Sequence, residues 1–335
     1  MYIVYAIIAL SIAAIAHEFG HYYMAKRAGI EVEEFGIGLG PKIFSFKRGE
    51  TTYYLKLIPF LGYVKIKGMD DNLDDPQGYF KKPLSKRFLT IFGGPLNNII
   101  LAIIIFFLLF SIFGDINHLS TKIEAVQENS PAHIAGIQKG DKILTINDVE
   151  IKQWDDVRTE IEKSNGEEIK IVVERENQIL TFYLTPVKSE DRWIIGIVSG
   201  FEKVNIFDAF ILSFKEVFNV IALFFYSLKL IFTGQAAGGI VGPIGIVQVA
   251  SDIGKTAGIV GFIWFAAILN ILLALTNLLP IPALDGGRIP FFIYELITKK
   301  KVPPEKENLV HFIGYIFLVG LLFVVTYFDI VRWIK

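Results

Sequence analysis

The chain has 335 residues, of which 53% are hydrophobic and 20% charged, and its formal net charge at pH 7 is −1. Such a composition is too apolar for an ordinary soluble domain and indicates several membrane-spanning segments. The near-neutral charge gives no basic footprint, so nucleic acid is not expected as a partner. The sequence contains no cysteine, which excludes disulfides and thiolate metal sites, and it contains five histidines. Any metal must therefore be held by nitrogen and oxygen atoms.

Four segments are long and apolar enough to span a bilayer, at about residues 2–25, 88–113, 258–279 and 310–330. The first begins without the basic region of a signal peptide, so we expect it to be retained. A fifth segment, 206–232, carries a polar stripe formed by Asp208, Lys215, Asn219 and Lys229. We expect this helix to lie in the membrane interface rather than to cross.

The first span contains the run Ala16-His17-Glu18-Phe19-Gly20-His21. His17 and His21 are four residues apart and therefore lie one turn apart on the same face of a helix. Two imidazoles at this spacing can hold one Zn²⁺, and Glu18 between them can act as a base on water. Ionisable side chains are costly inside a membrane and are usually functional there, which favours a metal site over a chance pattern.

A third ligand is expected from Asp285, which follows the third span. Pro280 and Pro282 break that span and free backbone groups at membrane depth, which is tolerated only in a protein-lined or hydrated cavity. A helix-capping role for Asp285 is the alternative. Three other acids, Glu31, Glu33 and Glu34, lie closer to His21 in sequence but belong to a polar loop. Two histidines and one aspartate would leave a fourth position for water, as in catalytic zinc sites.

The loop 27–87 is rich in lysine and arginine, which places it in the cytoplasm by the positive-inside rule. Residues 51–58 are rich in β-formers, Pro59 to Gly62 break the run, and 63–67 alternate, so we predict a hairpin. A plain surface hairpin is one interpretation. The other is an edge strand beside the metal that pairs with an extended peptide, and the residues expected to bind substrate are Tyr53, Tyr54, Leu55, Lys56 and Leu57.

The second span opens with Gly93-Gly94-Pro95-Leu96-Asn97-Asn98. Small residues allow close helix contact, and asparagine can donate or accept hydrogen bonds across helices. Close packing and a role in catalysis both fit this element. Downstream, Gly238 to Gly245 are expected to form a flexible loop.

Residues 115–204 have a normal soluble composition. Within them, Ser130 to Asn147 predict a short helix, a glycine turn and a strand, and this run resembles a PDZ domain. The resemblance implies a small β-rich domain that binds extended peptides or chain ends by strand addition. The alternative is a spacer that binds nothing.

Taken in order, an intramembrane His-Glu-x-x-His, a PDZ-like run and a distant Leu-Asp-Gly resemble the site-2 protease family, in particular the bacterial regulator of sigma-E protease type. The resemblance covers essentially the whole chain. It implies that His17, His21 and Asp285 bind one Zn²⁺ and that Glu18 is the catalytic base. It also matches Asn277 to a family asparagine that helps bind substrate or stabilise developing charge. Several relatives carry two PDZ domains, whereas this chain has room for one.

The predicted fold class is an α-helical polytopic membrane protein with four transmembrane helices, a membrane-associated β-hairpin and one inserted PDZ-like α+β domain. The expected parts are an N-terminal membrane core (1–114), the PDZ-like domain (115–204), an amphipathic helix with a glycine-rich loop (205–257) and a C-terminal membrane core (258–335). His17 and Asp285 must meet at one depth, which requires that 206–232 does not cross.

The function expected from the resemblance is intramembrane cleavage of single-span proteins, such as anti-sigma factors or remnant signal peptides, after a first extracytoplasmic cut. The chain would lie in the bacterial cytoplasmic membrane, in contact with the lipid bilayer, with its PDZ-like domain outside and its active site toward the cytoplasm. The alternatives are a membrane metal-binding or transport protein, which leaves Glu18 unexplained, and a PDZ receptor without catalysis, which leaves the whole metal motif unexplained.

Overall fold

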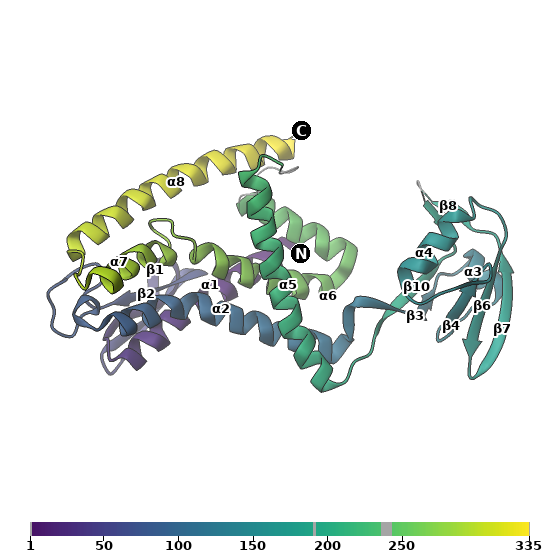
Figure 1. Cartoon of the computed structure of the whole chain (residues 1–335), viewed down its shortest axis with the longest axis horizontal. Helices are drawn as coiled ribbons and strands as arrows, with labels where there is room; N and C mark the ends of the chain where they lie inside the picture. The colour runs from purple at the N-terminus through teal and green to yellow at the C-terminus, as the bar shows by residue number, and fades with distance from the viewer. Residues whose placement is uncertain (1, 190–191, 236–242, 335) are drawn as a thin grey trace. The chain divides into compact units, whose positions relative to one another are not determined.

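The computed structural model describes residues 2–189, 192–235 and 243–334 (Figure 1). The chain forms two compact units. The membrane unit consists of residues 1–106 and 213–335, and the inserted unit consists of residues 107–212. The segment 115–204, expected to be a separate domain, falls inside the second unit.

The membrane unit is built from apolar helices, all of them long except α7 (Ile289–Thr298). These are α1 (Tyr2–Ala28), α2 (Leu84–Phe113), α5 (Ile206–Phe232), α6 (Pro243–Asn277), α7 (Ile289–Thr298) and α8 (Pro304–Ile334), of which α2 and α5 begin or end in the inserted unit. Lys26 and Arg27 lie in the last turn of α1, where cations complement the helix dipole. Gly29 follows with a φ of 69°, the left-handed conformation that commonly ends helices.

Five described helices are long and apolar enough to cross a membrane: Val4–Ala28, Leu84–Phe113, Ile206–Phe232, Gly258–Asn277 and Pro304–Val331. The four predicted spans all coincide with helices of this set. Ile206–Phe232 also passes the criterion of length and composition, so its placement in the interface stays a prediction. The short helix α7 was not predicted.

The segment before the third span differs from the prediction. Pro243 to Gly245, expected to belong to a flexible loop, form the start of α6, while Gly238 to Gly242 lie outside the described residues. The helix α6 is interrupted at Gly258, whose φ of 62° and ψ of −153° are not helical. The break at Gly258 coincides with the predicted start of the third span, since the stretch that is apolar enough to cross a membrane runs from Gly258 to Asn277.

The predicted hairpin of 51–58 with 63–67 is wrong. The structure has two long strands, β1 (Val32–Arg48) and β2 (Thr51–Ile66), which turn at Gly49 and Glu50. Residues 34–37 of β1 pair with two segments of β2, 52–55 and 62–65. Residues 44–48 of β1 also pair with 51–55. The segment 51–55 is thus paired on both sides and is no open edge, because the first half of β1 inserts beside it.

Close backbone contact joins α1 to α2. A Cβ added to Gly20 would lie 2.1 Å from the Gly93 carbonyl oxygen, so only glycine allows this approach. Pro95 lies inside α2, where it removes one backbone donor, a feature that membrane helices tolerate when neighbouring groups re-satisfy the ladder. The Gly-Gly-Pro element therefore acts as a helix contact, as one of its two interpretations expected.

The chain after α6 folds back in a compact turn, as Pro280 and Pro282 predicted. A 3₁₀ turn, η2 (Asp285–Arg288), begins at the aspartate and leads into α7. A Cβ on Gly286 would lie 2.3 Å from the Leu278 carbonyl oxygen, and one on Gly287 would lie 2.5 Å from that of Ile281. The two glycines after Asp285 are needed for this close return of the chain. A further 3₁₀ turn, η1 (Tyr79–Lys81), precedes α2.

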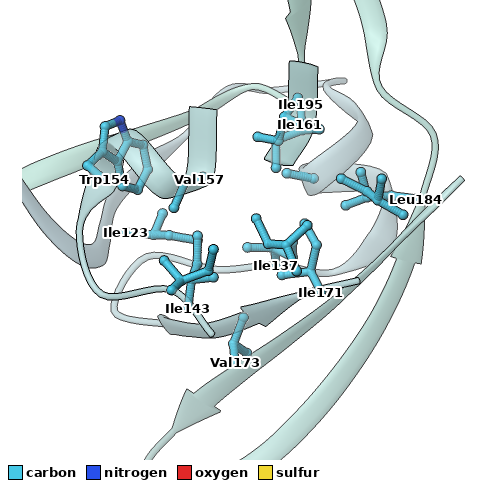
Figure 2. Packing of buried hydrophobic residues seen from close by; sticks show 14 residues of the cluster. Ile123, Ile137, Ile143, Trp154, Val157, Ile161, Ile171, Val173, Leu184 and Ile195 are labelled. Atoms are coloured by element: carbon cyan, nitrogen blue, oxygen red, sulfur yellow. The ribbon is translucent and has the colours of Figure 1, made fainter. Parts of the chain in front are cut away.

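The inserted unit is an α+β fold. Its elements are β3 (Asp115–Val126), α3 (Pro131–Ala135), β4 (Lys142–Ile146), β5 (Val149–Glu150), α4 (Trp154–Lys163), β6 (Ile169–Arg175), β7 (Gln178–Leu184), β8 (Val187–Ser189), β9 (Arg192–Ile194) and β10 (Ile197–Glu202). The main sheet has the order β10-β3-β4-β6-β7, with β5 beside β4, and β8 pairs with β9. Isoleucines from the sheet pack against Trp154, Val157 and Ile161 of α4, as Figure 2 shows.

The predicted run from Ser130 is confirmed in detail. The Ser130 hydroxyl accepts a hydrogen bond from the His133 backbone and caps α3, and Pro131 occupies the first turn. Gly136 ends the helix with a φ of 89°, and β4 follows. The helix, glycine turn and strand thus stand in the predicted order.

Candidate metal centre

Three predicted ligands converge on one point. The Nε2 atoms of His17 and His21 are 3.1 Å apart, and Asp285 Oδ2 lies 3.0 Å from the first and 3.3 Å from the second. Both histidines are buried, and the Asp285 side chain is 18% exposed. The helical spacing brings the two imidazoles together, while the turn after α6 brings the carboxylate from residues far along the chain.

The geometry of these atoms suits zinc. Ligands held about 2.0–2.1 Å from a tetrahedral zinc ion lie roughly 3.3 Å from one another. The observed separations of 3.0–3.3 Å are close to that figure. Asp285 Oδ2 is buried and makes no aligned hydrogen bond among the described residues, so a cation is the natural partner for its charge. The three groups form a candidate metal site of two nitrogens and one oxygen.

Glu18 and Asn277 lie at the same cavity. Its volume is about 420 Å³, and the residues lining it include the three ligands, Glu18 and Asn277. Gly62 of β2 packs against the Glu18 side chain, since a Cβ added to Gly62 would lie 3.2 Å from Glu18 Cγ. Glu18 is therefore oriented beside the metal site without being one of the three convergent ligands.

The predicted substrate residues do not line this cavity. Tyr53 to Leu57 are absent from its walls, and Tyr53 instead shares a hydrogen bond of 2.7 Å with Tyr22. The lining residues from β2 are Leu61, Gly62, Val64 and Ile66, and Met69 and Asp70 follow them. The alternation of residues 63–67 predicted that this segment is a strand, but it gave no information on which strand lies next to α1.

Gly94 on α2 backs directly onto the two imidazoles. A Cβ added there would lie 2.4 Å from His21 Nε2 and 2.8 Å from His17 Nε2. On the same helix the Thr90 carbonyl lies 2.9 Å from His21 Nδ1, and Asn97 Nδ2 donates to the Ala16 carbonyl at 2.5 Å. The element 90–98 therefore shapes the metal site, which joins its packing role to a functional one.

The turn that carries Asp285 is held by α8. Ala283, two residues before it, has a φ of 79°, which is unfavourable for a residue with a Cβ. Its backbone N–H donates to His311 Nδ1 at 3.2 Å. Arg288 forms a buried ion pair with Glu307, and Gly314 contacts Pro282. Sequence reasoning missed His311, because its role depends on which face of α8 meets the turn.

The long apolar helices and the cluster of His17, His21 and Asp285 point to one class of protein. A family model, Peptidase family M50, matches residues 5–321, and the chain belongs to that family, so the resemblance to the site-2 proteases is confirmed. Members are zinc metalloproteases, and zinc is the metal that the two histidines and the aspartate fit. The chain is accordingly a multi-pass membrane metalloprotease of the site-2 type.

Particular relatives support this assignment over their full length. A protein of Clostridium perfringens that carries the name of a zinc metalloprotease is 37% identical over 335 residues, which cover 99% of each chain. Zinc metalloprotease RasP of Shouchella clausii is 34% identical over 406 positions, with 96% of each chain covered. A Staphylococcus aureus relative is 32% identical over 422 positions, with 98% of this chain and 97% of its own covered. The longer alignments mean that the last two contain insertions relative to this chain.

Proposed function

We propose that this protein cleaves the membrane spans of single-span proteins, with His17, His21 and Asp285 as the zinc ligands. The observation that carries the proposal is the convergence of three ligand atoms within 3.3 Å beside Glu18, in a helix that is apolar enough to span a membrane. A transport protein would need the three ligands but would have no use for Glu18. Membership of a metalloprotease family also favours an enzyme over a transport protein.

Glu18 is the proposed catalytic base. When bound, zinc makes water more acidic and polarises the scissile carbonyl. Glu18 takes the proton from the attacking water and later delivers it to the leaving amine. Glu18 lines the cavity together with the three ligands, so its carboxylate is close enough to the metal site for this role. Asn277, which lines the same cavity, is proposed to bind the substrate backbone or to stabilise the negative charge that develops on the carbonyl oxygen.

The segment 61–66 is proposed to hold the substrate in an extended form. A helical substrate hides its carbonyls in internal hydrogen bonds, so it must unwind before cleavage. Residues 62–66 pair with 32–37 on one side, and Gly62 contacts the Glu18 side chain. Strand addition at this segment would place an unwound peptide beside the base. This replaces Tyr53 to Leu57 as the expected contact.

The finer expectations on setting and substrates are retained as proposals. The protein is proposed to lie in the bacterial cytoplasmic membrane with four spans, α5 in the interface, and both termini and the inserted unit outside. Its substrates are proposed to be membrane-anchored anti-sigma factors or remnant signal peptides trimmed beforehand. A cytoplasmic signal from a tag at residue 160 or 335 would contradict this topology.

The inserted unit is proposed to be PDZ-like and to control access. A cavity of about 930 Å³ lies between α4 and residues 192–197, where a peptide could bind. Steric exclusion of bulky outer domains is the other mode. Replacing 122–198 by a short Gly-Ser bridge should allow cleavage of an untrimmed substrate if the unit excludes it. If the variant still cuts the trimmed form but does not cut the untrimmed form, the inserted unit does not control access.

The catalytic proposal is tested with Glu18→Gln in reconstituted membranes. The variant should keep its zinc and lose cleavage of a single-span reporter, because it retains the ligands and lacks the base. Cleavage at the wild-type rate would exclude Glu18 as the base. If the variant retains its substrates, capturing and identifying them gives their identity.

A further inference from the structure

The two histidines at the metal site each have a second ring nitrogen. Because both Nε2 atoms point at the shared site, both must be unprotonated when a metal is bound, and each Nδ1 then carries the proton. Each Nδ1–H is buried and requires an acceptor. The acceptor fixes the tautomer and the ring orientation, and so it affects how well the metal is held.

His21 has a clear acceptor. Its Nδ1 lies 2.9 Å from the Thr90 carbonyl oxygen, which cannot act as a donor. The Nδ1 of His21 is therefore protonated, and its Nε2 is free to bind a metal. The same requirement applies to His17, whose Nδ1 also faces α2.

The group that faces His17 Nδ1 is the amide of Asn98. Asn98 is fully buried, with an exposed fraction of 0%. Its Nδ2 lies 3.5 Å from His17 Nδ1, while its Oδ1 has no hydrogen-bond partner among the described residues. This orientation sets an amide donor against a ring nitrogen that must itself donate. Since the oxygen and nitrogen of an amide occupy nearly equivalent positions, a half-turn about the Cβ–Cγ bond exchanges them.

We propose that Asn98 presents Oδ1 to His17 Nδ1–H and is a positioning residue for that metal ligand. The exchange gives the unpartnered Oδ1 a donor and gives the buried Nδ1–H an acceptor. It rests on the proposed role of His17 as a ligand. The amide does not touch the reacting atoms and acts through the imidazole.

The spacing of three residues on α2 indicates that one face of this helix contacts both histidines. Thr90, Gly94 and Asn98 are at intervals of four residues and lie along one face of α2. Thr90 holds His21, Gly94 leaves room for both rings, and Asn98 holds His17. One face of α2 thus fixes the orientation of both imidazole rings. This explains why Asn98, the second asparagine of the Gly-Gly-Pro element, is buried.

The test compares Asn98→Ala with Asn98→Asp in the full-length protein. Loss of an outer partner of a metal-bound histidine typically weakens metal affinity by about 10- to 100-fold, and we expect that loss in Asn98→Ala. Asn98→Asp retains an acceptor and should restore zinc affinity to the wild-type level or above. Zinc affinity is measured by chelator competition in detergent, independently of activity.

Asn270→Ala is the matched control. Asn270 is also buried in an apolar helix, at 1% exposure, and its Oδ1 also lacks a partner among the described residues, but it does not line the metal cavity. Its substitution should leave zinc affinity unchanged. A general effect of removing a buried amide would instead lower the affinity of both alanine variants.

A direct readout needs no substitution at Asn98. Nitrogen NMR of zinc-loaded protein labelled at histidine should show a protonated Nδ1 on His17, assigned by loss of the signal in His17→Ala. Unchanged zinc affinity in Asn98→Ala, an Asn98→Asp variant no better than alanine, or an unprotonated Nδ1 would each overturn the inference. Zinc retained in His17→Ala would instead contradict the proposed function itself, so the two failures are distinguishable.

Discussion

The two units differ in how completely their buried polar side chains are paired, although both contain buried ion pairs, such as Arg288 with Glu307 in the membrane unit. In the inserted unit the fully buried Asp141 carboxylate is matched by Arg175, whose Nε and Nη2 donate to it at 2.6 and 2.7 Å. In the membrane unit several buried polar atoms have no hydrogen-bond partner. Among the described residues these atoms are Tyr79 Oη, Asn98 Oδ1, Trp264 Nε1, Asn270 Oδ1, Asp285 Oδ2, Asn308 Oδ1 and His311 Nε2, and all seven residues belong to the membrane unit.

The difference locates the functional part of the molecule. A buried polar atom without a partner costs about 1–3 kcal/mol, so such atoms are retained where a ligand, water or ion completes them. Asn98 and Asp285 lie at the metal site, and Asn308 and His311 line an adjoining cavity of about 390 Å³ that also includes Asp285. Arg175 satisfies the buried Asp141 carboxylate within the inserted unit, whereas the buried Asp285 carboxylate of the membrane unit is placed where a cation can bind it.

The largest effect is expected from Gly94→Ala. The new Cβ would lie 2.4 Å from His21 Nε2, in the space that the ligands share. Zinc affinity should fall by at least about 100-fold, the upper end of what outer changes at metal sites cause. Gly320→Ala is the control, because a Cβ at Gly320 meets no atom within 4 Å. Full zinc content in the Gly94 variant would show that the site is not where the imidazoles converge.

A second large effect is expected in the inserted unit, from Asp141→Ala. Removing one member of a buried ion pair leaves the other unpaired, which lowers the free energy of unfolding by about 3 kcal/mol. Limited proteolysis should cut residues 115–204 faster, while zinc content stays at the wild-type level. Lys139→Ala disrupts an exposed pair with Glu124 and should change stability by less than about 1 kcal/mol. Zinc loss in the Asp141 variant would contradict the division of roles between the units.

How much of the fold and of the metal site can be predicted from the sequence depends on how far apart in the chain the contacting residues lie. The helical spacing of His17 and His21, and a proline-broken span before Asp285, were enough to predict that these three side chains come together. The β-sheet was predicted wrongly because residues 34–37 insert between 52–55 and 62–65, a pairing that no local pattern reveals. Asn98 was left between packing and catalysis, since the register of α1 against α2 decides its partner. His311 was missed for the same reason.

A smaller effect is expected from His311→Ala. The substitution removes the acceptor of the Ala283 N–H and leaves a left-handed residue unsupported beside Asp285. Zinc affinity should fall by about tenfold, at the lower end of outer-partner effects. His311→Asn retains an acceptor near the Nδ1 position and should recover most of the loss. Equal affinities in all three proteins would show that the turn holds Asp285 without α8.

The smallest effect is expected at acid pH in the inserted unit. The backbone N–H groups of Lys152 and Gln153 donate to Asp156 and lower the pKa of its carboxyl below 3.8. Because the folded pKa is depressed, the stabilisation is present above the unfolded pKa and is lost as pH falls through the folded value. Asp156→Asn should therefore reduce the stability of this unit at neutral pH and narrow its difference from wild type below about pH 4. A pH-independent difference in proteolysis would contradict the assignment.

The central claim, that His17, His21 and Asp285 form the zinc site, is tested most directly by zinc X-ray absorption. The wild type should show two histidine nitrogens and light oxygen ligands at about 2.0–2.2 Å. In Asp285→Ala the carboxylate contribution should vanish and zinc content should fall, whereas Glu34→Ala should match the wild type. An unchanged spectrum with full zinc in Asp285→Ala would contradict the account.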